Sequence, residues 1–388
     1  MSKCRINFRS YLALSSSERG IQLNDYSVPS GDLTGVNQAY KSEVFRVLEV
    51  GSLVGGDFVS DFEDQFAQYL GSKHVVSVAS GMDALILSLT ALEIPKNSKI
   101  LVSNNAGGYA SLATISAGFQ PVFCDIETSG YLLDISDLDK WSGQVNAIIA
   151  THLYGKMLNM SLISKWAKAN NVRVIEDCAQ AVGAIENGKR AGTFGDVGCF
   201  SFYPTKNLGG IGDGGAISTS NSDIAERLRK LANYGWGSRY DIQIPGGRNS
   251  RLDAINAAVL ARKLLCLDDK NSTRRKILKR YVSEFKNFNF MIDNDVADSH
   301  VGHLASARVA NPGKFQEFCK SHGVQITRHY PHQDSDQKGL NSGKVEVNTP
   351  RAKLHCEEVV NLPIYPELTE IQVSKVIETV LGWFESGN

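Results

Sequence analysis

The sequence predicts an α/β fold, with a large, mostly parallel β-sheet domain flanked by helices and a smaller C-terminal α/β domain. Short apolar runs typical of buried strands alternate with helical stretches of roughly ten residues, which is the pattern of parallel βαβ units. The chain has 388 residues, 42% of them hydrophobic and 21% charged, so it can build a sizeable core. Ten glycines between residues 183 and 215 then mark a segment whose backbone can approach a ligand closely.

Apolar periodicity locates the individual elements. Phe58, Phe62, Phe66 and Tyr69 recur at helical spacing and Gly71 follows, so a helix is predicted over residues 57–70. Further helices are predicted at residues 83–92, 109–117, 159–170, 223–232, 252–265 and 370–384. Strands are predicted at residues 74–79, 99–102, 121–126, 146–153, 172–176, 199–203 and 216–220. These elements divide the chain into an N-terminal segment (1–35), a large domain (36–265) and a small C-terminal domain (266–388).

Composition and charge exclude several classes of protein. Lys and Arg number 41, as do Asp and Glu, so no nucleic-acid partner is expected. The seven cysteines are never spaced C-x-x-C, which fits reduced thiols in a cytoplasmic protein better than disulfides. The start lacks the apolar core of a signal peptide, and no run reaches the roughly 18 apolar residues of a membrane span. None of the eight histidines lies at metal-ligand spacing, so no metal is expected either.

Two glycine-rich stretches match phosphate-binding sequence patterns but lack the structural context that such sites require. Residues 210–215 satisfy G-x-G-x-x-G, but a strand is predicted after them where a dinucleotide site needs a helix. Residues 183–190 resemble a P-loop, yet Arg190 stands where a Ser or Thr would hold magnesium. The sequence therefore favours neither an NAD-dependent nor an ATP-dependent enzyme.

Polar residues at strand ends indicate a different site. Ser80-Gly81 lies between a strand and a helix N-terminus, a place suited to phosphate, although an ordinary N-cap serine gives the same pattern. Glu176-Asp177 ends an apolar strand, where one carboxylate can face a pyridine nitrogen or simply cap a helix. Lys206 follows Ser201 closely in the glycine-rich segment, where a lysine can condense with an aldehyde; an isolated lysine is by default a surface residue.

Taken together, these segments resemble the DegT/DnrJ/StrS family of sugar aminotransferases. The resemblance implies a fold-type-I enzyme of the aspartate aminotransferase superfamily with a seven-stranded sheet, pyridoxal 5′-phosphate as cofactor and a keto-sugar substrate, usually nucleotide-linked. It runs from about residue 30 to the C-terminus and is most specific between residues 176 and 216. Its motifs are Ser80-Gly81-Met82-Asp83-Ala84-Leu85, Pro121-Val122-Phe123-Cys124-Asp125-Ile126, His152-Leu153-Tyr154-Gly155, Glu176-Asp177-Cys178-Ala179-Gln180, Gly195 to Gly209, Gly212-Asp213-Gly214-Gly215-Ala216, Asn249-Ser250-Arg251-Leu252-Asp253 and Asn361-Leu362-Pro363-Ile364-Tyr365-Pro366.

The resemblance also implies roles for individual residues. Lys206 binds the cofactor covalently and moves the proton during catalysis, Asp177 pairs with the pyridine nitrogen, and Gln180 contacts the ring near its 3′ oxygen. Asn249 reaches the cofactor phosphate of a second subunit, so the enzyme is expected to be a homodimer with shared active sites. The remaining cofactor-binding residues, around the phosphate, are Ser80, Gly81, Met82 and Ser201. The expected substrate-binding residues are Tyr109, His152, Arg248, His329 and Tyr330.

The implied reaction moves an amino group from L-glutamate, the family's usual donor, to a keto-deoxysugar linked to a nucleotide. Its product would enter amino-sugar biosynthesis for a surface polysaccharide, such as lipopolysaccharide, or a glycosylated product. A sugar dehydratase on the same fold is the nearest alternative, but dehydratases carry histidine where Lys206 stands. A non-catalytic relative would not need Lys206, Asp177, Gln180 and Ser201 together.

Three positions depart from the family pattern. Met82 replaces the usual threonine, which removes one hydroxyl contact to the phosphate. Gly107 stands where an aromatic residue commonly stacks on the cofactor ring, and Tyr109 or an asparagine is a candidate substitute. Gly247-Arg248 replaces a frequent Gly-Tyr, and Arg248 would suit an anionic substrate group or a surface position equally well.

Overall fold

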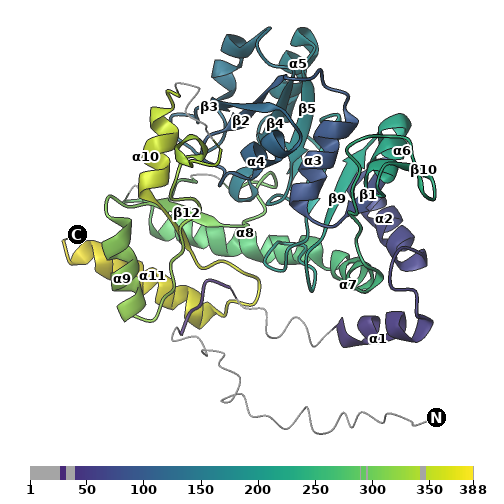
Figure 1. The fold of residues 1–388 in the computed structure, drawn as a ribbon. Helices are drawn as coiled ribbons and strands as arrows, with labels where there is room; N and C mark the ends of the chain where they lie inside the picture. Colours follow the sequence, from purple (N-terminus) through teal and green to yellow (C-terminus); the bar gives the residue numbers. More distant parts are fainter. Residues whose placement is uncertain (1–26, 32–39, 289, 294–295, 341–346, 388) are drawn as a thin grey trace.

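A seven-stranded sheet forms the centre of the larger part of the protein (Figure 1). The structure, a computed structural model, describes residues 27–31, 40–288, 290–293, 296–340 and 347–387. The spatial order of the strands is β1-β9-β8-β5-β4-β2-β3, and β9 alone runs antiparallel to its neighbours. The mostly parallel seven-stranded sheet is thus confirmed. Its strands are β1 (His74–Val78), β2 (Lys99–Ser103), β3 (Gln120–Cys124), β4 (Ala147–Thr151), β5 (Arg173–Asp177), β8 (Val197–Ser201) and β9 (Gly215–Thr219).

Helices cover both faces of this sheet. One face carries α3 (Gly81–Ala91), α4 (Tyr109–Ser116) and α6 (Ser222–Leu231). The other carries α2 (Asp57–Leu70), α5 (Met160–Asn170) and α7 (Ala254–Leu264), and α1 (Lys41–Val50) packs on α7. Because strand side chains alternate, Ile148 and Ile149 of β4 enter opposite cores. Both are fully buried, and burying one such side chain stabilises the fold by about 1.5–3 kcal/mol.

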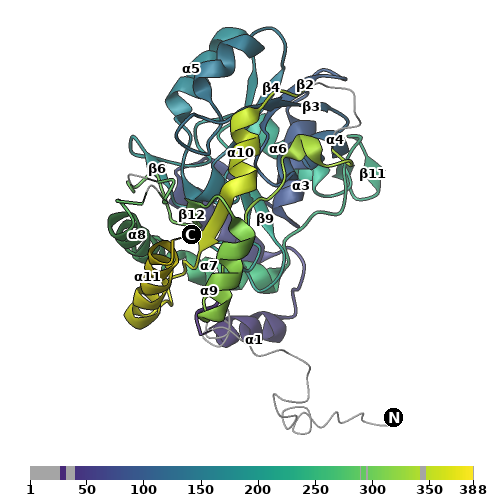
Figure 2. The same cartoon turned by 90° about the vertical axis from the view of Figure 1, so that its left-hand side faces the viewer.

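The smaller part is also α/β. Here α8 (Leu267–Glu284), α9 (Pro312–Ser321) and α11 (Glu370–Glu385) surround the antiparallel pair β12 (Ala305–Arg308) and β13 (Val359–Leu362). Preceding β13, α10 (Pro350–Glu358) lies between the large sheet and α9 in both views (Figures 1 and 2).

The two parts of the chain share α8. Leu267, at its start, packs in a core of the large sheet, whereas Leu278 packs in the core of the smaller part. The division between residues 265 and 266 therefore stays a prediction. Of the predicted N-terminal segment, 1–35, only residues 27–31 lie within the described residues, and Val28 packs in the smaller core.

Neither of the two apparent phosphate-binding motifs, residues 210–215 and 183–190, leads into a helix. Residues 210–215 lead into β9, and residues 183–190 contain the hairpin β6 (Ile185–Glu186) and β7 (Lys189–Arg190). A second short hairpin joins β10 (Trp236–Ser238) and β11 (Asp241–Ile242). Short 3₁₀ helices occur at η3 (Ile135–Trp141), η4 (Leu153–Gly155) and η5 (Asp334–Asp336). Within the described ranges, no helix combines the length and apolar character that crossing a membrane requires.

Candidate active site

A cavity of 520 Å³ opens at the carboxyl ends of the parallel strands. Ser80 and Gly81 follow β1, Asp177 ends β5 and Ser201 ends β8, so neighbouring strands bring residues distant in sequence to one edge. The smaller part of the protein closes the opposite side. Ten residues predicted for the site line this cavity: Ser80, Gly81, Met82, Tyr109, Asp177, Gln180, Ser201, Lys206, His329 and Tyr330.

Lys206 extends into the cavity from the turn after β8. Its backbone N–H donates to the carbonyl of Tyr203 at 2.8 Å, which tightens this turn. Burial lowers the pKa of the Lys206 amine to about 8, although the nearby Asp177 carboxylate opposes the shift. A sizeable fraction of the amine is therefore neutral near physiological pH and able to act as a nucleophile or base.

Asp177 is the buried anion of the site, with 7% of its surface exposed. Its Oδ1 accepts a hydrogen bond from the Ala179 N–H at 3.1 Å. Burial raises the pKa of its carboxyl, and this hydrogen bond and the Lys206 amine act against that shift. A buried carboxylate needs a cationic partner, and a protonated pyridine nitrogen is one that fits a cavity lined by this residue.

The helix start after β1 forms a narrow cradle. Ser80 is the N-cap of α3, and its Oγ accepts a hydrogen bond from the Asp83 N–H at 3.1 Å. The first N–H groups of a helix have no partner within it and favour an anion. A Cβ added to Gly81 would lie 2.7 Å from the Cβ of Ser201, so glycine is required for β8 to bring the Ser201 hydroxyl beside this helix start. The cradle suits a phosphate group.

Gln180 connects the two parts of the protein across the cavity. Its Oε1 accepts a hydrogen bond from the Tyr154 N–H at 2.6 Å, and its Nε2 donates to the Tyr330 hydroxyl at 3.0 Å. The Tyr154 hydroxyl in turn donates to the carbonyl of His329 and lies 2.9 Å from Nε2 of His355. These contacts fix the 329–330 segment against the large domain.

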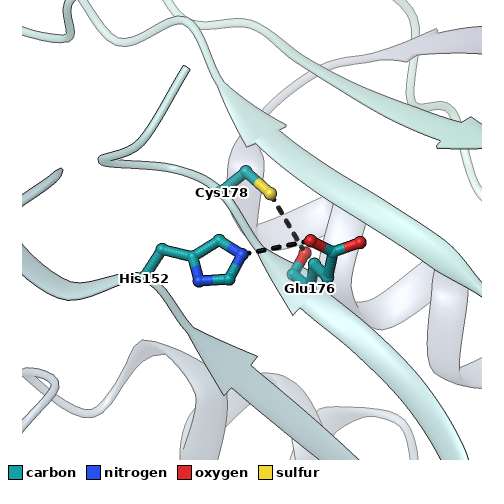
Figure 3. A group of neighbouring side chains, drawn as sticks. All are labelled: His152, Glu176 and Cys178. Carbon is teal, nitrogen blue, oxygen red and sulfur yellow. Dashed lines mark hydrogen bonds and ion pairs between the residues drawn. The ribbon is translucent and has the colours of Figure 1, made fainter. Parts of the chain in front are cut away.

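Glu176, the neighbour of Asp177, is fully buried and does not line the cavity; it lies beside His152 and Cys178 (Figure 3). Its Oε1 accepts hydrogen bonds from the N–H groups of Phe194 and Gly195, at 2.7 and 2.8 Å. Its Oε2 accepts one from Gly192 at 2.9 Å and lies 3.1 Å from Nε2 of His152.

The three side chains drawn in Figure 3 have the composition of a metal site: His152, Glu176 and Cys178. The protein itself already engages the carboxylate, with two partners at each oxygen. Both ring nitrogens of His152 are engaged as well, one by Glu176 and the other by the Leu158 N–H. This group therefore serves as a structural anchor.

Three predicted site residues lie outside the cavity. His152 is fully buried, and its second ring nitrogen, Nδ1, accepts a hydrogen bond from the Leu158 N–H at 3.2 Å. Both ring nitrogens thus contact the protein, and the expected substrate contact of His152 is replaced by a structural role. Arg248 forms an ion pair with Asp83 at 3.2 Å. Asn249 is exposed, and its Oδ1 accepts a hydrogen bond from Nε of Arg251 at 2.8 Å.

The cavity also contains residues that the sequence did not single out. His303 comes from the smaller part, where its Nδ1 lies 2.9 Å from Oδ1 of Asn207, and burial lowers the pKa of its imidazole well below the usual value. No local pattern surrounds His303, so only the tertiary fold reveals it. Asp213, by contrast, lies in the family motif at residues 212–216, so the sequence could have identified it as a candidate. Thr151, Tyr203 and Thr205 complete the polar lining.

The sheet, the cavity at its carboxyl edge and the buried Lys206–Asp177 pair define a class of protein: fold-type-I enzymes, whose cofactor is pyridoxal phosphate. The chain belongs to the DegT/DnrJ/EryC1/StrS aminotransferase family, whose profile matches residues 36–381. The predicted family, fold class and enzyme class are thereby confirmed.

Individual relatives agree with this assignment. The chain is 40% identical over 359 residues, 91% of its length and 98% of the relative's, to the dTDP-3-amino-3,6-dideoxy-alpha-D-galactopyranose transaminase of Aneurinibacillus thermoaerophilus. The structure of DesV from S. venezuelae, in complex with a ketimine intermediate, superimposes with a TM-score of 0.85 at 33% identity, covering 90% of this chain and 95% of DesV. NtdA from Bacillus subtilis, solved with bound cofactor PMP, gives a TM-score of 0.84 at 25% identity, covering 90% of this chain and 82% of NtdA.

Proposed function

We propose that this enzyme uses pyridoxal phosphate to transfer an amino group from L-glutamate to a ketone of a nucleotide-linked keto-deoxysugar. The observation that carries the proposal is the Lys206 amine beside the buried Asp177 carboxylate in a cavity large enough for a cofactor ring and a sugar. The 40% identity to a dTDP-3-amino-3,6-dideoxy-galactose transaminase supports a dTDP-linked 6-deoxyhexose with its ketone at carbon 3. The product would serve amino-sugar biosynthesis, for example for lipopolysaccharide.

When bound, pyridoxal phosphate supplies an electron sink that stabilises negative charge on the carbon that loses a proton. Asp177 makes this sink effective because its carboxylate favours a proton on the ring nitrogen. Gln180 is placed to donate a hydrogen bond near the 3′ oxygen, with Tyr330 as its present acceptor. The helix start at Ser80, Gly81 and Met82, together with the Ser201 hydroxyl, holds the phosphate.

Lys206 has two tasks at a single atom, its Nζ. The amine would be the point of covalent attachment for the cofactor. As a free amine, it would accept the substrate proton and return it as general base and acid. A pKa of about 8 suits both directions of transfer, because a group near its pKa at working pH exchanges a proton at little cost. Tyr109, at the start of α4, and His329, from the smaller part, line the same cavity and are placed to contact the sugar.

A homodimer is part of this proposal. α1 and the turn after it expose five large apolar side chains that a second copy would cover: Phe45, Leu48, Val50, Leu53 and Val54. Asn249 is exposed and lies outside its own chain's cavity, as expected for a residue that serves the partner's site. Arg248 lies beside it and is a candidate for an anionic group of the substrate.

Shared sites can be tested by complementation. Lys206→Ala and Asn249→Ala each inactivate a homodimer, but a mixed dimer has one site with both native residues. Mixing the two inactive proteins should restore activity up to about a quarter of wild type, as random subunit exchange puts half of the dimers in the mixed form. If size-exclusion chromatography shows a dimer and mixing restores nothing, Asn249 does not act in trans.

The reaction itself is tested with a panel of keto-sugar nucleotides and glutamate, read by mass spectrometry. Transamination replaces the ketone oxygen by an amine, whereas the dehydratase alternative removes water and leaves no nitrogen in the product. The protein should be yellow, and glutamate should bleach the colour. A colourless protein that binds no cofactor would favour the non-catalytic relative.

Six described cysteines are free thiols, which supports the proposed cytoplasmic location.

A further inference from the structure

The loop between β2 and α4 brings two glycines to the rim of the cofactor cavity. Gly107 and Gly108 have φ angles of +78° and +83°, a region that other residues rarely adopt. A Cβ added to Gly107 would lie 2.8 Å from Cγ, Cδ1 and Cε1 of Tyr330. The Tyr330 ring therefore packs directly against the backbone of Gly107 and fills the space where a side chain at this position would stand.

Hydrogen bonds clamp the segment that carries Tyr330 onto this loop. Both Asp334 oxygens are used: the Gly108 N–H donates to Oδ1 at 2.8 Å, and the Ser111 hydroxyl donates to Oδ2 at 2.6 Å. Asn104 binds the backbone and the hydroxyl of Ser335, each at 2.9 Å. Asp334 and Asn104 are fully buried. Asn104 and Gly108 of this loop thus hold a segment of the smaller part in place, whereas Ala106 lines the cavity.

Tyr330 is the best enclosed of the tyrosines that line the cavity. Three tyrosines line it, and two of these, Tyr109 and Tyr203, expose about half of their surface, at 53% and 51%. Tyr330 is more deeply placed, its hydroxyl accepts the Gln180 hydrogen bond, and Tyr109 meets it edge to face at 6.0 Å between ring centroids. Gly107, Gln180 and Tyr109 together leave the ring little freedom to rotate.

We propose that Tyr330, supplied by the smaller part of the protein and seated on Gly107, forms the aromatic wall against which the cofactor ring stacks. This inference rests on the proposed function, because it takes the pyridine ring to lie beside Asp177 and Gln180. It reassigns Tyr330 from substrate contact to cofactor contact. It also accounts for Gly107, since any side chain there would displace the tyrosine.

Stacking can be measured without turnover by titrating cofactor-free protein with pyridoxamine phosphate and following protein fluorescence. This ligand forms no covalent bond with Lys206, so its Kd reports the contacts of the cavity. Tyr330→Leu removes the aromatic face and should raise Kd about tenfold. Tyr330→Phe keeps the ring and loses the hydroxyl, so its Kd should stay within about threefold of wild type.

A double-mutant cycle tests the pairing with Gly107. Gly107→Ala should raise Kd in the wild-type background, because its Cβ pushes the Tyr330 ring aside. The same change should have little further effect on Kd once Tyr330→Leu is present. Gly108→Ala is the matched control for backbone strain: its φ is also positive, but its Cβ would meet Leu340 and Gln337 instead of Tyr330. It should therefore show no coupling to Tyr330→Leu.

Three results would contradict the proposal. Tyr330→Leu could bind pyridoxamine phosphate as tightly as wild type and raise only the KM for the sugar, which would return Tyr330 to the substrate. Alternatively, the effects of Gly107→Ala and Tyr330→Leu on Kd could simply multiply, which would mean that the two positions act independently. If wild type itself fails to bind pyridoxamine phosphate, the cofactor assignment fails, and with it the proposed function. Thermal unfolding of each variant checks that a lost affinity is not lost folding.

Discussion

Replacing Lys206 by methionine should stabilise the cofactor-free protein. Burial lowers the pKa of this amine from 10.5 to about 8, so the folded state disfavours the charged form that the unfolded chain carries. At 1.36 kcal/mol for each pH unit, a difference of about 2.5 corresponds to an upper bound of about 3 kcal/mol at pH 7. Attraction by Asp177 is already included in that shift. Because the cavity admits water, we expect about 1–3 kcal/mol.

The pH dependence gives the prediction its sign. Since the folded pKa lies below the unfolded one, the penalty is fully present below pH 8 and decreases as pH rises toward 10.5. The upper bound on the advantage of Lys206→Met should therefore fall from about 3 kcal/mol at pH 7 to about 2 kcal/mol at pH 9. Lys206→Arg is the matched control, because a guanidinium cannot lose its proton in this range and should gain no stability.

Urea unfolding of the cofactor-free wild type, Lys206→Met and Lys206→Arg measures the free energy of unfolding of each protein at pH 7 and at pH 9. A Lys206→Met variant that is less stable than wild type at pH 7 would refute the reasoning, because the amine would then be stabilising the fold through contacts of its own. An advantage that grows between pH 7 and pH 9 would refute the assigned direction of the pKa shift.

Three other substitutions separate catalysis from structure. Asp177→Asn keeps the shape of the side chain but removes the negative charge that favours a protonated ring nitrogen. The rate of the reaction with glutamate, measured by stopped-flow absorbance, should therefore fall at least about 100-fold, whereas Tm should change little. Glu176→Gln replaces a buried carboxylate that accepts three backbone hydrogen bonds by an amide whose nitrogen cannot accept one. The free energy of unfolding, measured with urea, should therefore fall by about 2–4 kcal/mol. For Asp334, burial raises the pKa to about 6 from 3.8. The wild type should therefore lose stability relative to Asp334→Asn as pH rises from 4 to 6, by at most about 2 kcal/mol, and urea unfolding at both pH values checks the sign.

The sequence predicted the strands well because each buried strand is a continuous apolar run between turn residues. The largest displacement shows what such reasoning omits. A strand was predicted at 199–203, whereas β8 spans Val197–Ser201. Gly198 precedes the predicted strand but lies inside β8. Glycine is required there because a Cβ would come within 2.4 Å of Cα of Gly192. Two segments of backbone approach closely at this point, which is a property of the tertiary fold.

The candidate site divides in the same way. Lys206, Asp177 and Ser201 could be placed in one cavity from the sequence because each lies in a recognisable local motif, at the end of a strand or just after it. His152 stood in an equally clear motif, but its partner Glu176 and the Leu158 N–H turn it into a core residue. His303 and the Gly107–Tyr330 contact join residues far apart in the chain. Such contacts leave no pattern within a window of sequence, so only the packed structure could reveal them.

The adjacent carboxylates of β5 together set the geometry of the catalytic pair. Because side chains alternate along a strand, Asp177 faces the cavity and Glu176 the opposite side. Glu176 binds the backbone of Gly192, Phe194 and Gly195, which fixes the residues just before β8. The chain continues from there into β8, whose Cys199 pairs with Asp177 itself, and then to Lys206. The distance between the lysine and its aspartate is thus determined by a short, rigid path through the backbone, so a change at Glu176 should reach the catalytic site although Glu176 lies outside the cavity.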